Sequence, residues 1–403
     1  MIKKIRVKNF KSFKDLELNL GKVNILIGAN ASGKSNFVQI FEFLKDIARD
    51  GLDKAISKDG KYLKNIDSDE LLIEVTFNPF PANLIPSGLI GEESKYTILI
   101  KFKEDGSGIE KVEDKIILGY ILDIGEKSDS GIMIFSNDNG MLDAQIISSI
   151  HAEIPQETSE YFKLYQNVID TMKLRKDSLL LESPLSPMLF AKPYNPFKEI
   201  LTYDLDPQLS KKAVPIFSWG RELERNGENL FNVVKNILID PEKKRMFMNL
   251  VSDLLPYIED IEVDKFEETH FYLKIKETYS DKHYLPAHLS SDGTINALGL
   301  IVALYFQESP LIIIEEPDRG FHPSLISKVV DMMKDASRKK QIIVTTHNSE
   351  MVRHADIEDI KLVSRDKEGF SHISNPMDKE ETKIFLENEM GLAELFVDNL
   401  LEI

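Results

Sequence analysis

A short loop near the start of the chain has the residue types and spacing that bind phosphates. The run Gly28-Ala29-Asn30-Ala31-Ser32-Gly33-Lys34-Ser35 fits the pattern G-x-x-x-x-G-K-[ST], between a predicted strand at 23–27 and a predicted helix at 36–48. Backbone N–H groups at such a helix start can surround phosphates, while Lys34 would reach the β- and γ-oxygens and Ser35 would ligate Mg²⁺. The sequence therefore predicts a site for ATP and Mg²⁺. The predicted contact residues are Asn30, Ala31, Ser32, Gly33, Lys34, Ser35 and Asn36.

Two carboxylates end a second predicted strand. The apolar residues 311–314 are followed directly by Glu315 and Glu316. In an ATPase with a phosphate-binding loop, one such carboxylate would hold the Mg²⁺ shell, and its neighbour could orient or deprotonate the attacking water. A strand that ends in an exposed acidic turn is common, so this assignment depends on the presence of the loop 28–35.

Two more segments have polar residues that could bind a ligand, one after a predicted strand and one before a predicted helix. His347 follows a predicted strand at 341–346, and the carboxyl end of a strand in a doubly wound sheet is the ligand side. Ser291, Asp292 and Gly293 precede the apolar helix predicted at 294–307. Ser, Asp and Gly are also ordinary capping residues. This segment is therefore either a cap or a second phosphate-binding helix start.

The elements that must position these residues follow from the pattern of apolar segments. Strand and helix alternate after residue 294, with a helix at 323–336, which argues for parallel strands in one sheet with 23–27. Further strands are predicted at 2–20 (two, around a turn), 71–77, 96–102, 115–122, 132–135, 258–263 and 270–275. Residues from about 150 to 255 are mostly helical in pattern, most clearly at 229–238 and 241–255. The expected fold class is α/β with an antiparallel β arm and a mainly helical insertion.

Composition excludes several classes of protein. The 403 residues include 50 Lys and Arg, 67 Asp and Glu and no cysteine, with a formal net charge of -17. Without cysteine there is no disulfide, Cys–zinc site, iron–sulfur cluster or thiol catalysis, and a reducing cytoplasm is the expected location. The longest apolar run, 297–306, is shorter than the ~20 residues that span a bilayer. The opening ten residues have no signal-peptide pattern, so we expect no membrane association.

The acidic balance also bears on nucleic acids. A net charge of -17 argues against general coating of DNA but leaves room for a local basic patch, for which the candidate is the set Lys3, Lys4, Arg6, Lys8, Lys11 and Lys14. The simpler interpretation is that Lys4, Arg6 and Lys8 form the solvated face of a strand.

The order of the motifs resembles that of the ABC-type ATPase heads of the SMC and RecF group. The run 314–323, I-E-E-P-D-R-G-F-H-P, is similar to a run of RecF-like ATPases. That clade includes the ATPase part of overcoming-lysogenization-defect nucleases and ATPases of anti-phage systems. Residues 9–13 and 226–230 also look like segments of this group, and the resemblance is specific over about 1–50 and 285–350. It implies a P-loop NTPase head with a mixed sheet, formed by 1–124 and 285–403, with 125–284 as insertion or lid.

The resemblance also implies roles for particular residues. Glu315 would share the Mg²⁺ with Ser35, Glu316 would be the catalytic base, and His347 would sense the γ-phosphate, while His322 falls at the D-loop position. The signature residues Ser291, Asp292 and Gly293 would act on the ATP of a partner subunit, which implies a head-to-tail homodimer. The signature reads Ser-Asp-Gly-Thr in place of Ser-Gly-Gly-Gln, and no Q-loop glutamine is identified.

The leading hypothesis is an ATPase that dimerises around ATP and drives or gates a protein effector, in a DNA transaction or anti-phage defence. One alternative is a nucleotide-dependent scaffold with little turnover, and another is a P-loop kinase that acts on a small molecule.

Nuclease-bearing relatives append a metal-binding toprim domain, but 56 residues follow His347, so no such domain is expected. The acidic pair Asp204 and Asp206 is interpreted as a turn or cap.

Overall fold

The chain forms two compact units. The computed structural model describes residues 1–65, 68–78, 89–104, 108–123, 128–148, 171–183, 197–212, 214–215, 222–266, 270–280 and 283–378, with residues 163, 167, 169 and 195. Unit 1 comprises 1–21, 36–200 and 364–373, and unit 2 comprises 22–35, 201–363 and 374–403. The predicted limits of an ATPase head, 1–124 and 285–403, and of an insertion, 125–284, stay a prediction.

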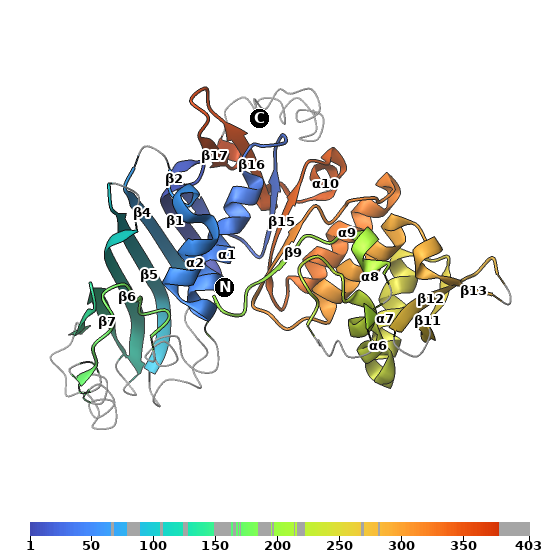
Figure 1. Cartoon of the computed structure of the whole chain (residues 1–403), viewed down its shortest axis with the longest axis horizontal. Coiled ribbons are helices and arrows are strands. Elements are labelled where there is room, and N and C mark those ends of the chain that lie inside the picture. The colour runs from blue at the N-terminus through green and yellow to red at the C-terminus, as the bar shows by residue number, and fades with distance from the viewer. Residues whose placement is uncertain are drawn as a thin grey trace. The chain divides into compact units, whose positions relative to one another are not determined.

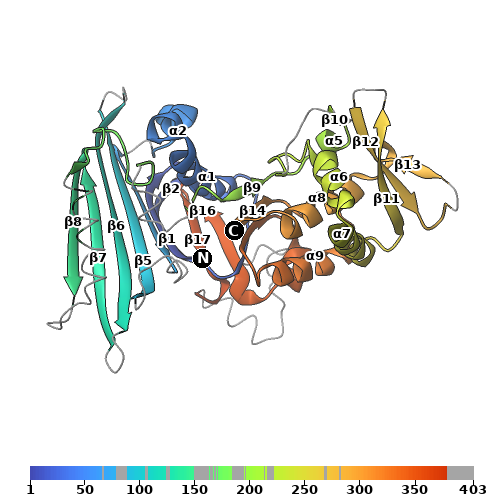
Figure 2. The same ribbon diagram turned by 90° about the horizontal axis from the view of Figure 1, so that it is seen from below.

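Unit 1 contains a seven-stranded antiparallel sheet with the strand order β2-β1-β4-β5-β6-β7-β8, of which Figure 1 labels β1 to β7 and Figure 2 labels β8. Its strands are β1 (Ile2–Phe10), β2 (Phe13–Asn19), β4 (Glu70–Phe77), β5 (Leu89–Phe102), β6 (Ile109–Asp123), β7 (Ser128–Asp138) and β8 (Met141–Ser148). Buried residues alternate with half-buried ones along β4, as expected where a sheet has one covered face. The predicted antiparallel arm is confirmed, and it is longer than the sequence pattern indicated because β8 also joins it.

Two helices cover one face of this sheet. α1 (Lys34–Asp50) and α2 (Leu52–Asp59) lie along it, and a short 3₁₀ helix, η1 (Gly60–Tyr62), follows (Figure 2). Phe43 of α1 packs on Phe10 of β1 with ring centroids 6.1 Å apart, and Phe37 packs edge-on against Phe13 at 6.5 Å. Late in the chain, β17 (Ser371–Ser374) returns to this unit, where the Ser371 N–H donates to the Ser12 carbonyl at 2.8 Å.

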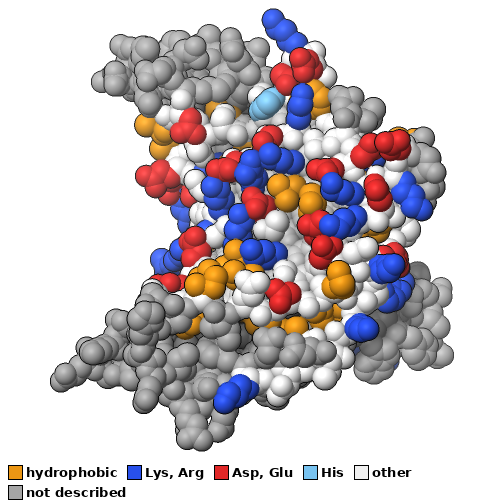
Figure 3. Space-filling view, turned by 90° about the vertical axis from the view of Figure 1, so that its left-hand side faces the viewer, with side chains coloured by type: hydrophobic (Ala, Val, Ile, Leu, Met, Phe, Trp, Pro, Cys, Tyr) orange, Lys and Arg blue, Asp and Glu red, His pale blue; other side chains and the backbone are white. Residues whose placement is uncertain are grey.

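The basic patch predicted on β1 is charge-paired. Lys4 lies 2.6 Å from Glu17, Arg6 lies 3.7 Å from Asp15, and Lys8 lies 3.6 Å from Asp15. Figure 3 shows Lys and Arg side chains intermixed with Asp and Glu on the face that it draws. DNA phosphates would therefore have to displace carboxylates from these cations.

A buried carboxylate joins three parts of unit 1. Asp114 of β6 accepts hydrogen bonds from the Tyr96 hydroxyl at 2.6 Å, the Asn137 amide at 2.8 Å and the Leu180 N–H at 2.7 Å. Burial raises the Asp114 pKa to about 7, against the effect of these three donors. The pKa of Asp114 is higher in the folded chain than in the unfolded chain. The stabilisation that its protonated form contributes is therefore fully present below about pH 4 and is lost as pH rises through about 7.

We therefore expect Asp114→Asn to remove a pH dependence. Between pH 5 and pH 8 the free energy of unfolding of the wild type should fall by about 2–3 kcal/mol more than that of the variant, whose residue 114 does not ionise. Chemical denaturation of both proteins at the two pH values measures this difference. If the free energy of unfolding changed equally in the two proteins, Asp114 would not titrate in this pH range.

Unit 2 contains five parallel strands in the order β16-β3-β15-β14-β9. They are β3 (Val23–Ile27), β9 (Leu201–Tyr203), β14 (Leu311–Glu315), β15 (Gln341–Thr346) and β16 (Ile360–Arg365). The prediction that 23–27, 311–314 and 341–346 share one parallel sheet is confirmed. The prediction of a mostly helical 150–255 is wrong at β9, because three residues before an Asp-rich turn are too few to give a periodic pattern, and it is wrong at 172–183, which forms turns and irregular backbone. Most of 150–170 and of 184–196 lies outside the described residues.

Helices and a smaller sheet complete unit 2. The helices are α5 (Pro207–Ser210), α6 (Leu230–Ile239), α7 (Pro241–Leu254), α8 (Asp292–Tyr305), α9 (Pro323–Ala336) and α10 (Ser349–His354), with 3₁₀ turns η3 (Ala287–Leu289), η4 (Ile357–Asp359) and η5 (Pro376–Asp378). The smaller antiparallel sheet comprises β10 (Val214–Pro215), β11 (Ile258–Phe266), β12 (His270–Glu277) and β13 (Tyr284–Pro286).

A continuous apolar core holds the parallel strands of unit 2 to its helices. Ile312 and Val344 of the sheet share this core with Leu300 of α8 and Val330 of α9, all at most 1% exposed. α8 is buried along nearly its whole length, which explains why its sequence is apolar on every side. In the described part of the chain, no helix is both long enough and apolar enough to cross a membrane.

Candidate functional site

The parallel register of unit 2 brings three chain segments to one edge of the sheet. Glu315 on β14 lies beside Thr345 on β15, and Thr346 lies beside Ile27 at the end of β3. Parallel strands end at the same edge, so the loop 28–35, Glu316 and His347 all follow strands at this edge. It is the position at which open α/β sheets bind ligands.

The loop 28–35 has a backbone that a phosphate-binding loop requires. A Cβ atom on Gly28 would lie 2.1 Å from the Val363 carbonyl oxygen, so no side chain fits there. Ala31 and Gly33 have φ angles of 63° and 117°, which turn the chain tightly into α1. The Lys34 ammonium donates to the carbonyls of Gly28 and Ala29, both at 2.8 Å. Burial lowers the Lys34 pKa, although the charge of Glu316 opposes this.

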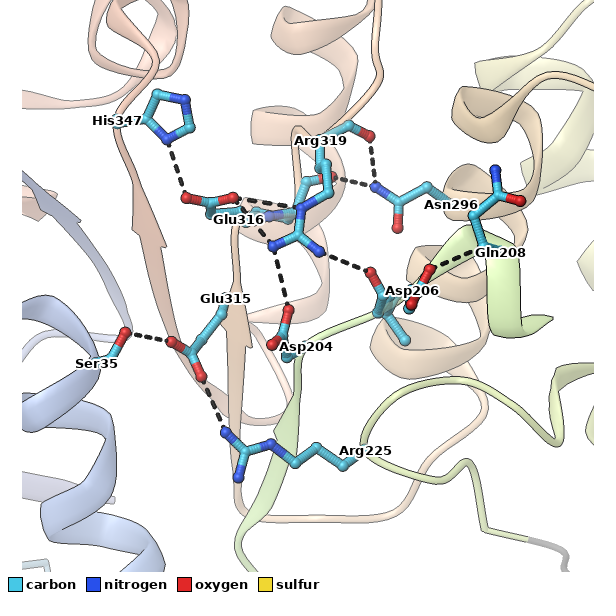
Figure 4. A network of polar contacts seen from close by, with 12 residues as sticks. Ser35, Asp204, Asp206, Gln208, Arg225, Asn296, Glu315, Glu316, Arg319 and His347 are labelled. Atoms are coloured by element: carbon cyan, nitrogen blue, oxygen red, sulfur yellow. Dashed lines mark hydrogen bonds and ion pairs between the residues drawn. The ribbon is translucent and has the colours of Figure 1, made fainter. Parts of the chain in front are cut away.

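Glu315 links the loop to the strand-end acids. One carboxylate oxygen, Oε2, accepts from the Ser35 hydroxyl at 2.8 Å, and the other, Oε1, lies 3.1 Å from Nη2 of Arg225 (Figure 4). A hydroxyl beside a carboxylate is a suitable pair of oxygen ligands for Mg²⁺, which is usually held by one or two protein groups together with substrate phosphates. Among the described residues, no three His, Asp or Glu side chains converge as a metal site of their own.

Glu316 lies beside Glu315 in a strained backbone conformation, with φ at 46°. His347 Nδ1 lies 3.0 Å from its Oε1, and Arg319 holds its Oε2 through Nε at 3.3 Å and Nη2 at 3.1 Å. Burial would raise the Glu316 pKa, but the Arg319 hydrogen bond and the charges of His347 and Arg319 hold it below its ordinary value. The carboxylate is therefore ionised and able to accept a proton at neutral pH.

Arg319 belongs to a network that sequence reasoning missed. Its Nη2 lies 3.3 Å from Asp204 Oδ1, and its backbone carbonyl accepts from the Asn296 amide at 2.8 Å. Asp204 was predicted to belong to a turn or cap, but it pairs with this arginine instead. The cap is Asp206, whose carboxylate accepts from the Gln208 N–H at 2.9 Å at the start of α5. Asp204 and Arg319 are 115 residues apart in the sequence, and no sequence motif predicts an ion pair over that separation.

The signature segment begins α8. The Ser291 hydroxyl accepts from the Thr294 N–H at 3.1 Å and so caps the helix. A hydrogen bond from Lys211 lowers the Asp292 pKa. A Cβ on Gly293 would lie 2.4 Å from the Gly320 carbonyl oxygen, so packing already requires glycine there. The capping interpretation has structural support, and the action of these residues on a partner's ATP stays a prediction.

The structure therefore brings Lys34, Ser35, Glu315, Glu316 and His347 together at one sheet edge. A pocket of about 450 Å³ adjoins the group and is lined in part by Glu316 and His347. The nucleotide contacts predicted for Asn30 to Asn36 stay predictions. Asn36 itself lies in unit 1, where its amide donates to the Ser12 hydroxyl at 2.7 Å.

Comparison with known families and curated proteins gave two similarities. The family model described as "AAA domain, putative AbiEii toxin, Type IV TA system" matches residues 23–353. A curated protein, endonuclease GajA of Bacillus cereus (strain VD045), is 21% identical over 372 residues, covering 87% of this chain and 56% of that protein. The chain thus spans about half the length of this curated relative. The family match includes every residue of the sheet-edge group.

Solved structures similar to this chain include heads of SMC proteins. The SMC head bound to the C-winged helix domain of ScpA gives a TM-score of 0.47 at 18% identity, covering 93% of this chain and 96% of that one. The SMC head domain from Thermotoga maritima gives 0.40 at 15% identity, covering 93% and 98%. The Pyrococcus furiosus head bound to the C-terminal domain of ScpA gives 0.43 at 17% identity, covering 96% and 99%.

Proposed function

The chain belongs to the AAA domain family whose model it matches, and from that premise we propose that it binds ATP at the loop 28–35 and hydrolyses it in the cytoplasm. The observation that carries the proposal is the hydrogen bond of 2.8 Å between Ser35 and Glu315. It joins the loop to the strand-end acids in the arrangement that a Mg²⁺-dependent phosphoryl transfer needs.

Each residue at the sheet edge has a distinct task in this proposal. Lys34 would exchange its bonds to loop carbonyls for bonds to the β- and γ-phosphates, while Ser35 and Glu315 would hold Mg²⁺. When bound, Mg²⁺ supplies charge neutralisation on the phosphates. Glu316 would take the proton of the attacking water, and His347, which is hydrogen-bonded to Glu316, would sense the γ-phosphate.

We further propose that two chains dimerise head to tail around ATP and so drive or gate a protein effector. This rests on the exposed start of α8, where Ser291 and Asp292 are accessible to a second chain, and on the resemblance to the RecF and SMC group. The same resemblance supports a role in a DNA transaction or in anti-phage defence.

Phosphate release from ATP by the purified protein in Mg²⁺ tests hydrolysis directly.

The second candidate function is an ATP-dependent scaffold with little turnover. It is favoured by one observation, because both oxygens of Glu316 already have partners, His347 and Arg319. Tight ATP binding without phosphate release would support the scaffold and exclude the ATPase.

DNA binding, where it occurs, should be weak and salt-dependent. The cations Lys4, Arg6 and Lys8 are paired, so each phosphate contact must break an ion pair, and affinity should fall steeply as salt rises. Removal of the paired charge in Glu17→Gln should strengthen duplex binding several-fold. Fluorescence anisotropy from 50 to 200 mM salt measures both effects, and tight binding that ignores salt would refute a role for this patch.

A further inference from the structure

The guanidinium of Arg319 contacts two carboxylates at once. Its Nη2 lies 3.1 Å from Oε2 of Glu316, the proposed base, and 3.3 Å from Oδ1 of Asp204. Its Nε adds a second contact to Oε2 of Glu316 at 3.3 Å, and its Nη1 donates to the Leu205 carbonyl at 3.4 Å. Figure 4 shows both carboxylates directed at the guanidinium. One cation thus joins the turn after β14 to the chain that leaves β9.

The backbone of Arg319 is fixed by the turn that follows β14. The Arg319 N–H donates to the Glu316 carbonyl at 3.1 Å, which closes this turn and brings the two residues together. The Asn296 amide of α8 donates to the Arg319 carbonyl at 2.8 Å. Gly320 packs on the start of α8 so closely that a Cβ on Gly293 would lie 2.4 Å from its carbonyl oxygen. Both β14 and α8 therefore set the point from which the Arg319 side chain extends.

Glu316 depends on its neighbours for its orientation. Its φ of 46° is strained, and such a conformation persists only where the surrounding structure over-determines it. His347 contacts one oxygen, Oε1, through Nδ1 at 3.0 Å. A carboxylate held at one oxygen still turns about that contact, so the two Arg319 contacts on Oε2 are needed to fix its direction. Without the guanidinium, Glu316 and Asp204, which now share one nitrogen, would also repel each other.

The contacts of Glu316 leave an acceptor site for water. An ionised carboxylate has about four lone-pair sites and only accepts hydrogen bonds. Arg319 donates two N–H groups to Oε2 and His347 donates one to Oε1, so Oε1 keeps a site for a further donor. All three side chains line the pocket of about 450 Å³, through which water reaches the carboxylate. Because a general base must lie within hydrogen-bond reach of the proton that it takes, the direction of Oε1 affects the rate of hydrolysis.

We infer that Arg319 is a positioning residue for the proposed base: it directs Glu316 so that Oε1 meets the proton of the attacking water. Asp204 and the Leu205 carbonyl hold the guanidinium in place for this task. The inference rests on the proposed function and deepens it, because it gives the chain after β9, which carries no motif, a part in hydrolysis. Among the described residues, the guanidinium bonds to Glu316, Asp204 and Leu205 and not to the loop 28–35, so we expect an effect on turnover and not on ATP binding.

The test measures phosphate release against ATP concentration and, by titration calorimetry, the affinity for the non-hydrolysable analogue AMPPNP, both with Mg²⁺. Arg319→Ala should lower kcat about 10- to 100-fold, as expected for a displaced catalytic group, and change AMPPNP affinity less than about 3-fold. Arg319→Lys, which keeps the charge but not the planar fork, should recover part of the rate. Arg338→Ala is the matched control and should change neither quantity, because Arg338 pairs with Asp335 over the same i,i+3 spacing at an exposed site.

The same substitution in the Glu316→Gln protein separates positioning from a structural role. If Arg319 acts through the Glu316 carboxylate, Arg319→Ala should lower the residual rate of Glu316→Gln less than about 3-fold. A further loss as large as in the wild type would overturn the inference, and so would a loss of AMPPNP affinity that matches the loss of rate.

An unchanged or raised rate in Arg319→Ala alone would also overturn the inference, and a raised rate would mean that the guanidinium restrains the base. A wild-type protein that releases no phosphate would refute the proposed function and this inference with it. An active wild type whose rate does not fall in Arg319→Ala would refute the inference alone. The failures of the two proposals are therefore distinguishable.

Discussion

The Glu316→Gln protein should bind ATP as the wild type does and release phosphate about 10²–10⁴-fold more slowly, the usual contribution of a general base. The amide keeps the size of the carboxylate but cannot accept the proton of the attacking water. In the wild type, Arg319 and His347 lower the pKa of the Glu316 carboxyl, so it is ionised at neutral pH. The loss of hydrolysis rate in the variant should therefore be seen throughout the neutral pH range. Phosphate release under saturating Mg²⁺–ATP measures it, with Glu308→Gln, an exposed acid after α8, as control.

The same variant tests the proposed dimer. If ATP bridges two chains, blocking hydrolysis should leave a stable dimer, which light scattering detects with and without ATP. Adding Ser291→Arg should return monomers and leave ATP bound to the loop 28–35. Residue 291 lies at the start of α8, which in the proposed dimer contacts the ATP of the other chain, so the arginine should disturb the dimer contact and not the loop of its own chain. A Glu316→Gln protein that remains monomeric in saturating ATP, or one that hydrolyses at the wild-type rate, would contradict the sandwich mechanism.

The Lys34→Ala protein should lose ATP binding by about 100-fold or more. The lysine is the cation of the loop, and charge-assisted hydrogen bonds to phosphate are among the strongest in proteins. Its ammonium is already placed over the loop, 2.8 Å from two carbonyl oxygens. Binding of a fluorescent ATP analogue measures the loss, and Lys339→Ala, at an exposed position after α9, is the control. Unchanged affinity would mean that the loop does not bind phosphate.

Several elements of the site were predictable because each has a local signal. The glycine pattern of the loop 28–35, the apolar strand before Glu315 and the strand before His347 are short, contiguous features. Their alternation with helices correctly placed them at one edge of a parallel sheet. The resemblance to RecF- and SMC-like ATPases, which depends on the same contiguous motifs, is confirmed at the level of the family by the match over residues 23–353.

The partners of the strand-end acids were not predictable. Arg225 and Glu315 are 90 residues apart, and Asp204 meets Arg319 only because β9 lies beside β14 in the sheet. β9 has three residues, too few for a periodic signal. Ion pairs between exposed or half-exposed side chains leave no pattern in composition, so the electrostatic environment of the acids emerges only when the chain is folded.

Titration calorimetry of Mg²⁺–ATP into the Glu316→Gln protein tests the central claim most directly, because hydrolysis does not obscure the heat of binding. The account predicts saturable binding of one ATP per chain, which disappears when Lys34→Ala is added to the same protein. Absence of binding, or binding that survives the loss of Lys34, would contradict the claim that the loop 28–35 and the acids at the edge of the parallel sheet form an ATP site.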